Sequence, residues 1–323
     1  MIPEIGGSAE LQAKLRKLLK EYKHIFSEEL EPQAAKVAPM DIGVNKDMWQ
    51  RNKHSLPPRP QTAAKELEIE RQIKAMLASK VIKESQAPWY SQVHLTPKPD
   101  NKWRFCIDYR YLNECCEAKS WPIPNVDRML QRLGTKRAKF YAVMDLTKGY
   151  YQAPMSLNSQ AATAFITFMG TYEWLRVPMG LKSAPSYFQQ QMGQTVLGGL
   201  MYHILELYLD DIIVFGTSED EYVANLRQVF DRLTKFGITL NPNKCRFGMN
   251  EVEYVGHTIN EEGMSFSTEK RGEVLDFPLP TTHKGMKQFL GLANYFRDHI
   301  KNHAIITQPL QAMVTNYNKK QST

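Results

Sequence analysis

The chain has few cysteines and no long apolar run, and these absences exclude several classes of protein. Cys106, Cys115, Cys116 and Cys245 are too few and too scattered for a disulfide framework, and no C-x-x-C spacing indicates zinc. No apolar segment approaches the ~20 residues that span a bilayer, and the N-terminus lacks the apolar core of a secretory signal. We therefore expect reduced thiols, no membrane partner, and a cytoplasmic or nuclear location.

The charge balance is mildly basic. The 323 residues include 41 Lys and Arg against 34 Asp and Glu, which gives a net charge of +7 and a pI near 9.0. This balance favours a polyanionic partner but does not identify one, because many ordinary domains are mildly basic. The length favours one large lobed unit or two to three subdomains.

The first 80 residues predict two helices separated by an extended connector. Apolar residues recur at helical spacing near the N-terminus, at Leu11, Leu15, Leu18, Leu19 and Tyr22. Residues 31–60 contain five prolines, which lack the N–H and disfavour helix in the preceding residue, so this stretch is expected to be extended. A second helix follows, with Ile69, Ile73, Met76 and Leu77 on one face.

Two further segments predict strands that carry charged residues. Residues 102–110 alternate, with Arg104, Asp108 and Arg110 on the face opposite Trp103 and its apolar partners. Residues 140–144 form a short apolar run that ends in Asp145, which suits a strand that delivers a carboxylate to the end of a sheet.

An acidic pair is expected at the tip of a tight hairpin. Residues 207–209 and 212–215 are apolar, and Asp210-Asp211 between them are the residues left for the turn. Two like charges side by side are costly there, and such a local violation marks function more often than folding. The last ~40 residues predict helix, and the mixed strand and helix content gives the fold class α+β.

The three aspartates are candidates for two-metal chemistry. Nucleotidyl transfer by two metal ions requires carboxylates from separate chain segments at one site, and Asp145 with the Asp210-Asp211 hairpin meets that requirement. The alternative is that Asp145 caps a following helix and that the acidic pair is a solvated turn.

A set of motifs in a fixed order favours the metal-binding interpretation of these aspartates over the alternative. Tyr208 to Asp211 is Y-L-D-D, and the others are W-R-F-C-I-D-Y-R-Y-L-N (103–113), D-L-T-K-G-Y-Y-Q (145–152), V-P-M-G-L-K-S-A-P-S-Y-F-Q (177–189), Y-V-G-H (254–257) and F-L-G-L-A-N-Y-F-R (289–297). Together they resemble the reverse transcriptase of gypsy-type LTR retrotransposons, and the resemblance covers residues 10–312.

The resemblance implies a right-hand polymerase fold with fingers, a ferredoxin-like palm and a helical thumb. It divides the chain into an N-terminal helix and connector (1–54), fingers (55–120 and 153–183), palm (121–152 and 184–262) and thumb (263–323). It implies an RNA-directed DNA polymerase that adds dNTPs to a primer 3′-hydroxyl. Asp145, Asp210, Asp211 and the Leu146 carbonyl would bind two Mg²⁺ ions, for which Mn²⁺ can substitute.

The resemblance also implies the residues that bind substrates. Those that match the dNTP site are Lys98, Arg104, Tyr150, Met179 and Gly180, and those that match template or primer positions are Asp108, Arg110, Tyr254, Val255, Gly256 and His257. Without the family, Arg104, Asp108 and Arg110 would be a solvated strand face, Tyr150 a core tyrosine and Gly180 an ordinary turn glycine. Members commonly have Phe or Gln where this chain has Met179.

The expected partners are an RNA or DNA template with its primer, including an RNA/DNA hybrid, and dNTPs. RNase H and integrase domains are expected on a parent polyprotein rather than here, and no D-[ST]-G protease signature is present. Two other functions remain open: a nucleic-acid-binding remnant without activity, and a nucleotide cyclase, against which the flanking motifs argue. Nucleotide incorporation with Mg²⁺ separates the first from a polymerase.

Overall fold

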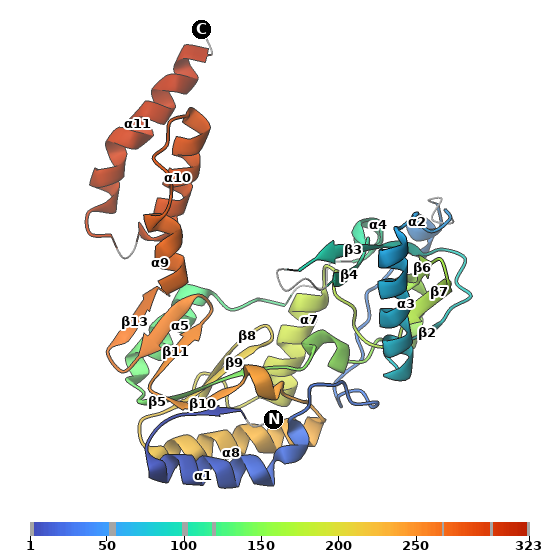
Figure 1. Ribbon diagram of the computed structural model, residues 1–323, viewed down its shortest axis with the longest axis horizontal. Helices are drawn as coiled ribbons and strands as arrows, with labels where there is room; N and C mark the ends of the chain where they lie inside the picture. Colours follow the sequence, from blue (N-terminus) through green and yellow to red (C-terminus); the bar gives the residue numbers. More distant parts are fainter. Residues whose placement is uncertain are drawn as a thin grey trace. The chain divides into compact units, whose positions relative to one another are not determined.

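The computed structural model describes residues 3–51, 56–98, 103–117, 121–266, 268–297 and 300–321. The chain divides into two units: one comprises residues 1–255 and 259–264, and the other comprises residues 256–258 and 265–323. Figure 1 shows the elements of both units, coloured by sequence. Within the described residues no helix is long and apolar enough to cross a membrane, and all four cysteines are free thiols.

A five-stranded sheet forms the centre of the first unit. Its strands, in sheet order, are β1 (Glu4–Ile5), β10 (Arg246–Met249), β5 (Phe140–Asp145), β9 (Asp211–Gly216) and β8 (Leu205–Tyr208). The central pair, β5 and β9, is antiparallel and in register along all six residues of each strand. The predicted strand at 140–144 is confirmed, and Asp145 is its last residue.

Each face of this sheet buries a different apolar cluster. On one face Ala142, Met144 and Val214 join the larger core under α1 (Ala9–Glu21) and α8 (Glu219–Phe236), which lie side by side in Figure 1. On the other face the alternate residues, among them Tyr141 and Ile213, pack with α5 (Val126–Lys136). Because successive side chains of a strand point to opposite faces, these two clusters fix which residues share a face.

The helices that cover the sheet begin at side-chain caps. Ser8 accepts a hydrogen bond from the Leu11 amide at the start of α1, and Ser218 accepts one from the Glu221 amide at the start of α8. α8 ends at Gly237, which has a left-handed φ of 67°. The predicted N-terminal helix is confirmed, and its leucines are buried against the core.

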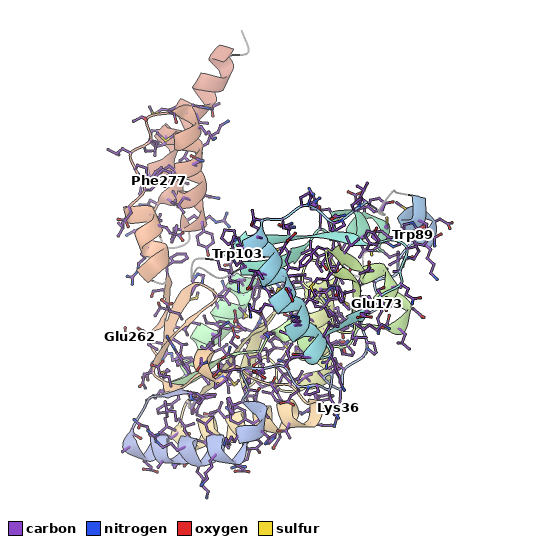
Figure 2. The ribbon with its side chains drawn as sticks, turned by 45° about the vertical axis from the view of Figure 1, so that its right-hand side comes forward. Lys36, Trp89, Trp103, Glu173, Glu262 and Phe277 are labelled. Atoms are coloured by element: carbon purple, nitrogen blue, oxygen red, sulfur yellow. The ribbon has the colours of Figure 1, made fainter. Side chains whose placement is uncertain are left out.

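A second five-stranded sheet lies in the same unit, with α3 (Ala63–Ala78) packed on it. Its strands, in sheet order, are β2 (Ile82–Glu84), β7 (Gly170–Trp174), β6 (Phe165–Thr167), β3 (Ser91–Pro97) and β4 (Trp103–Ile107). Trp103 of β4 and Glu173 of β7 are labelled in Figure 2. Further α-helices in the described part of the unit are α2 (Lys46–Arg51), α4 (Arg110–Cys115), α6 (Leu157–Gln160) and α7 (Ala184–Gln190).

The structure corrects two expectations in this region. The predicted strand at 102–110 is too long, because β4 ends at Ile107 and Arg110 is the first residue of α4. The Tyr109 amide donates to the Ile107 carbonyl, which turns the chain, so Asp108 and Arg110 do not share a strand face with Arg104. In its described residues, 31–51 and 56–60, the connector is irregular as expected, except that it contains the short helix α2.

The second unit is helical, as the sequence predicts for the C-terminal residues. Its helices are α9 (Thr268–Leu275), α10 (His283–Tyr295) and α11 (His303–Gln321). Three short strands near the boundary between the units, β11 (Glu251–Tyr254), β12 (His257–Asn260) and β13 (Gly263–Phe266), form a sheet in that order.

Tyr222 of α8 provides a test of how the helix is attached to the sheet. Its buried hydroxyl donates to the Tyr141 carbonyl and accepts from the Gly248 amide, at 3.0 and 2.8 Å. We expect Tyr222→Phe to lower the free energy of unfolding by about 1 to 3 kcal/mol, because it leaves buried backbone groups unpaired. Urea unfolding measures this, with the half-exposed Tyr202→Phe as a control that changes stability by less than about 0.5 kcal/mol. Equal effects of both substitutions would contradict the prediction.

Candidate active site

The two central strands bring two carboxylates to the same point of the sheet. Asp145, the last residue of β5, is paired directly with Asp211, the first residue of β9. Residues opposite one another in an antiparallel pair project from the same face, with Cβ atoms roughly 4.5 to 5.5 Å apart. The Asp145 carbonyl accepts from the Asn241 amide at 2.9 Å, which anchors the end of β5.

The hairpin between β8 and β9 places Asp210 next to this pair. The prediction that Asp210 and Asp211 form the tip is wrong by one residue, because Tyr208 pairs with Asp211 and the loop is Leu209-Asp210. Leu209 has a left-handed φ of 56°, which is uncommon for a residue other than glycine.

Gln189 of α7 holds this strained loop. Its buried side chain accepts a hydrogen bond from the Leu209 amide at 2.7 Å and donates to the Leu207 carbonyl at 3.4 Å. One side chain therefore contacts the backbone on both sides of Tyr208, and it explains how the loop keeps its conformation without a glycine.

Burial and mutual repulsion work against ionisation of the acidic cluster. Burial, together with the charges of Asp210 and Asp145, raises the pKa of Asp211 to about 6, although Lys244 opposes the shift. Burial also raises the pKa of Asp145. The Lys244 ammonium lies 3.2 Å from one Asp145 carboxylate oxygen and supplies a single compensating charge.

The donor chemistry of this cluster fits a hard divalent cation. In the described part of the chain, no three His, Cys, Asp or Glu side chains are placed closely enough to hold a metal ion by themselves. Mg²⁺ is usually bound by one or two carboxylates together with waters and substrate phosphates, so a complete protein cage is not required. A bound cation would offset the burial and the repulsion that raise the pKa of Asp211.

The chain returns to the hairpin shortly after Asp145. Gly149 begins a 3₁₀ turn, Gly149–Gln152, and a Cβ built on it would lie 3.5 Å from the Asp210 Cβ atom. The next residue, Tyr150, is half-buried and packs on Phe188 with ring centroids 5.0 Å apart. Burial and the charge of Asp210 raise the pKa of Tyr150 to about 12. Tyr150 therefore belongs to the acidic cluster as well as to the core.

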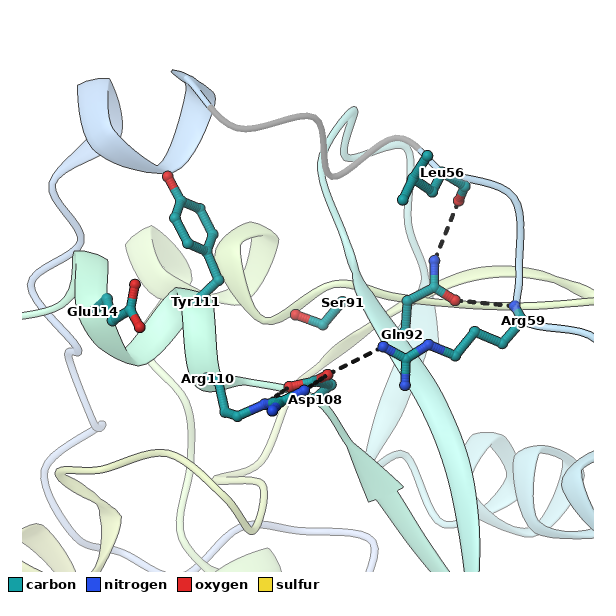
Figure 3. A pocket seen from close by; sticks show the side chains of 8 residues that line it. All are labelled: Leu56, Arg59, Ser91, Gln92, Asp108, Arg110, Tyr111 and Glu114. Atoms are coloured by element: carbon teal, nitrogen blue, oxygen red, sulfur yellow. Dashed lines mark hydrogen bonds and ion pairs between the residues drawn. The ribbon is translucent and has the colours of Figure 1, made fainter.

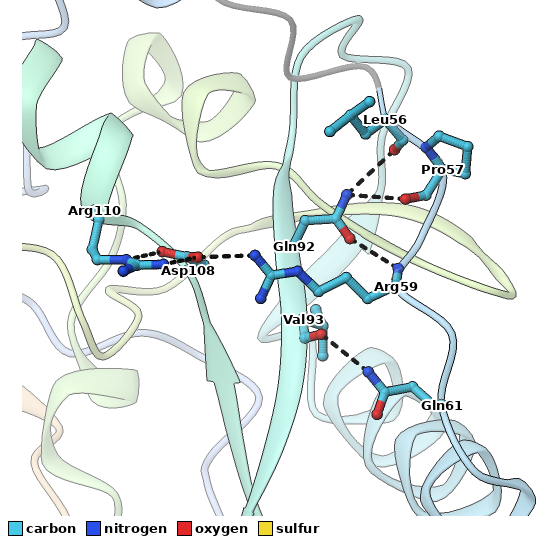
Figure 4. Close-up of polar contacts among 8 residues, drawn as sticks. All are labelled: Leu56, Pro57, Arg59, Gln61, Gln92, Val93, Asp108 and Arg110. Atoms are coloured by element: carbon cyan, nitrogen blue, oxygen red, sulfur yellow. Dashed lines mark hydrogen bonds and ion pairs between the residues drawn. The ribbon is translucent and has the colours of Figure 1, made fainter.

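A second cluster of candidate residues surrounds Asp108. Asp108 accepts from both Arg110 and Arg59, at 2.7 and 3.2 Å (Figures 3 and 4). The Arg110 guanidinium holds the pKa of Asp108 well below its usual range. The three side chains line a cavity of about 410 Å³ that also contacts Leu56 and Tyr111. Gln92 binds the backbone of Leu56, Pro57 and Arg59, which fixes the connector at the rim (Figure 4).

Gly180 and Met179 lie near this cluster. Gly180 has a φ of 96°, which requires glycine, and its carbonyl accepts from Asn113 at 2.8 Å. With His94, Asp108 and Arg110 it lines a neighbouring cavity of about 530 Å³. The Met179 side chain is exposed. Lys98 and Arg104 are exposed on or beside the β3 and β4 strands.

The Y-V-G-H segment lies at the turn between β11 and β12. Tyr254 is buried, and its hydroxyl donates to the Asp211 carbonyl at 3.0 Å, which ties the end of β11 to the start of β9. His257 is also buried and stacks on Phe266. Val255 and Gly256 form the turn, with φ values of 49° and 75°.

Sequence reasoning missed three residues that the structure adds to these clusters. Lys244 and Gln189 contact the acidic cluster, and Arg59 contacts Asp108. Gln189 was visible only as the last letter of a motif, whereas Lys244 and Arg59 lie outside every motif. Their contacts span 99 and 49 residues for Lys244 and Arg59, so no local pattern could indicate them.

Comparisons with known proteins agree with this geometry. Residues 96–259 match the family model described as reverse transcriptase (RNA-dependent DNA polymerase). The Pol polyprotein of transposon 297 from Drosophila melanogaster is 37% identical over 265 residues, which is 80% of this chain and 25% of the relative. That of transposon 412, also from Drosophila melanogaster, is 32% identical over 300 residues, 91% of this chain and 24% of the relative. The chain thus spans about a quarter of the length of these relatives.

A solved structure has the same fold. The foamy viral protease-reverse transcriptase in complex with double-stranded DNA superposes with a TM-score of 0.81 at 25% identity, over 96% of this chain and 54% of that chain. The right-hand polymerase fold expected from the motifs is therefore confirmed.

The raised pKa of Asp211 predicts a pH-dependent stability in metal-free buffer. The folded state keeps the Asp211 proton up to about pH 6, whereas an unperturbed aspartate releases it near pH 3.8. The folded state therefore binds more protons in this window, and its stability falls as the pH rises through it. We expect Asp211→Asn to be more stable than the wild type above pH 6. The expected difference is about 1 kcal/mol, a value already lowered because Asp211 is partly exposed.

Urea titrations between pH 4 and 8 measure this difference. The exposed Glu28→Gln is the control and should leave the pH profile unchanged. If Asp211→Asn leaves the dependence of stability on pH unaltered, the raised pKa does not belong to Asp211.

Proposed function

Because the chain belongs to the reverse transcriptase family, we propose that it is an RNA-directed DNA polymerase that adds deoxynucleotides to a primer 3′-hydroxyl. The observation that carries this proposal is the pairing of Asp145 with Asp211, with Asp210 in the adjoining loop. The relatives are Pol polyproteins, and a structural neighbour was solved with double-stranded DNA. The partners are therefore a template with its primer, including an RNA/DNA hybrid, and RNase H and integrase belong to the parent polyprotein.

The three aspartates and the Leu146 carbonyl are the groups that would hold two Mg²⁺ ions, or Mn²⁺ in their place. When bound, such ions activate the attacking hydroxyl and neutralise charge on the phosphates. The protein itself keeps the carboxylates in position: Gln189 fixes the loop, and Tyr254 supports the strand that carries Asp211. Lys244 favours the ionised form of Asp145.

Substrate contacts extend over the second sheet. Lys98 and Arg104 bind the triphosphate of the incoming nucleotide, and the planar fork of Arg104 suits phosphate oxygens. Gly180 and Met179 lie under the incoming base pair. The left-handed backbone of Gly180 lets the chain approach the bases closely.

Template and primer contacts follow from the two other groups of residues. Asp108 and Arg110 contact the template strand. At the primer, the turn residues Val255 and Gly256 make the contact, and the buried Tyr254 and His257 hold that turn in place.

The subdomains follow the elements of the fold. We assign β5, β8, β9 and β10 to the palm, the sheet that contains β3 and β4 to the fingers, and α9 to α11 to the thumb. This assignment keeps the boundaries at 55–120 and 153–183 for the fingers and places the palm at 121–152 and 184–262.

Tyr150 is proposed as the residue that selects deoxyribose. It lies five positions after Asp145 and beside Asp210, so its ring occupies the volume that a ribose 2′-hydroxyl would need.

Removal of a metal-binding carboxylate tests the enzymatic proposal. We expect Asp145→Asn and Asp210→Asn to retain less than a few per cent of primer extension on oligo(dT)-primed poly(rA) with Mg²⁺, because each change deletes an anionic oxygen ligand. Duplex affinity should stay within about two-fold, since the basic surface is unchanged. Asp127→Asn, at an exposed site on α5, is the control with normal extension. A wild-type chain that binds duplex but never extends a primer would favour a non-enzymatic remnant.

Replacement of Tyr150 tests sugar selection. Tyr150→Val should lower the preference for dATP over ATP on poly(rU) by about ten-fold, since relief of ~1.4 kcal/mol of clash suffices. The measurement is the ratio of kcat/KM values for the two nucleotides. Tyr172→Val is the matched control, because Tyr172 is buried against Phe165 in the sheet that contains β3 and β4 and should affect stability alone. An unchanged ratio together with a lowered Tm would return Tyr150 to a packing role.

A further inference from the structure

Arg176 is a buried cation whose guanidinium, among the described residues, hydrogen-bonds to backbone carbonyls alone. Its side chain is 4% exposed. One terminal nitrogen donates to the carbonyls of Tyr151 and Gln152, at 3.4 and 3.2 Å, and the other to those of Glu31 and Pro32, at 3.3 and 2.8 Å. No carboxylate of the described residues lies within 4.0 Å of the guanidinium.

Packing alone does not explain this arrangement, because the arrangement costs free energy. Burial of a charge without a counterion costs free energy, and burial lowers the pKa of Arg176. A methionine would fill similar volume without this cost. The planar fork of arginine has one property that an apolar residue lacks, because it can bind two pairs of carbonyls in a fixed geometry.

The two pairs of carbonyls belong to segments far apart in the sequence. Glu31 and Pro32 lie in the N-terminal connector, whereas Tyr151 and Gln152 end the 3₁₀ turn that starts at Gly149. The same Gln152 carbonyl also accepts from the Ala35 amide at 2.8 Å. The connector and the turn are therefore joined both by Arg176 and directly.

The Gln152 side chain also holds the turn in place. The buried Gln152 side chain donates to the carbonyls of Thr147 and Thr239, at 2.9 and 2.8 Å, and accepts from the Thr239 amide at 2.7 Å. The Thr147 hydroxyl donates to the Ser27 carbonyl at 2.6 Å. With the backbone at 147 and 151–152 fixed, the position of Tyr150 follows from the turn geometry.

We propose that Arg176 is a positioning residue of the nucleotide site, which sets the place of the Tyr150 ring beside Asp210 and makes residues 31–35 of the connector part of that site. This inference rests on the proposed function and deepens it, because it names a determinant of sugar selection that touches neither nucleotide nor metal. Loss of the hydrogen bonds from Arg176 to the four carbonyls lets the turn move and widens the space for a 2′-hydroxyl.

Arg176→Lys is the main test, because lysine keeps the charge but has one nitrogen and cannot span both pairs of carbonyls. We expect the dATP to ATP ratio of kcat/KM to fall at least three-fold, mainly through a raised KM for dATP, with primer-template affinity unchanged. Arg132→Lys is the matched control: Arg132 binds buried Glu206 through two hydrogen bonds on another face, so its replacement should leave the ratio unchanged. Arg176→Met should reproduce the effect.

A double-mutant cycle shows whether Arg176 acts through Tyr150. In a Tyr150→Val background, Arg176→Lys should leave the ratio unchanged, because the ring that it positions is absent. An unchanged ratio in the wild-type background, or an equal fall in both backgrounds, overturns the proposal.

Hydrogen exchange tests the role of the Arg176 hydrogen bonds without an assay of activity. The Tyr151 amide donates to the Lys148 carbonyl and the Ala153 amide to the Tyr150 carbonyl. Both amides should exchange faster in Arg176→Lys, because the turn opens locally in that variant. In Arg132→Lys they should exchange at the wild-type rate. Unchanged exchange in Arg176→Lys overturns the proposal even if the chain proves inactive, whereas an inactive wild type with the expected exchange would count against the proposed function alone.

Discussion

The antiparallel register between β5 and β9 is the constraint on which the candidate site depends. Asp145 lies opposite Asp211 only because every residue from Phe140 onward is paired with its partner on β9. A shift of one residue would move the whole apolar set of a strand to the other face. Here both faces are buried, with Met144 in one cluster and Tyr141 in the other. Two hydrophobic cores therefore hold the two carboxylates side by side.

This position is electrostatically unfavourable, and the surrounding residues offset only part of the cost. Burial and neighbouring charge raise the pKa of Asp211 to about 6, while Lys244 contributes one positive charge next to Asp145. Gln189 holds Leu209 in a left-handed conformation that most residues avoid. Like charges and backbone strain that persist at one point are typical of a site kept for chemistry rather than for stability.

The sequence predicted the elements whose pattern is local. The N-terminal helix and the strand that ends at Asp145 follow from apolar periodicity alone, and the ordered motifs identified the family that the comparisons confirm. The hairpin loop was misplaced by one residue because its left-handed position is Leu209, with no glycine to mark it, and because Gln189, 20 residues away, stabilises it. The predicted strand at 102–110 is longer than β4 because the turn at Tyr109 depends on backbone hydrogen bonds rather than on a change of alternation.

The connector was the element that local patterns described least well. Proline content predicted an extended chain, but not where that chain runs. The Met40 amide donates to the Pro154 carbonyl and the Ser156 amide donates to the Met40 carbonyl, so the connector continues alongside the residues that follow the Tyr150 turn. Each of these bonds joins positions more than 100 residues apart. If Arg176 positions Tyr150 as proposed, a substitution in the connector alters the space beside Asp210 without any contact with a substrate.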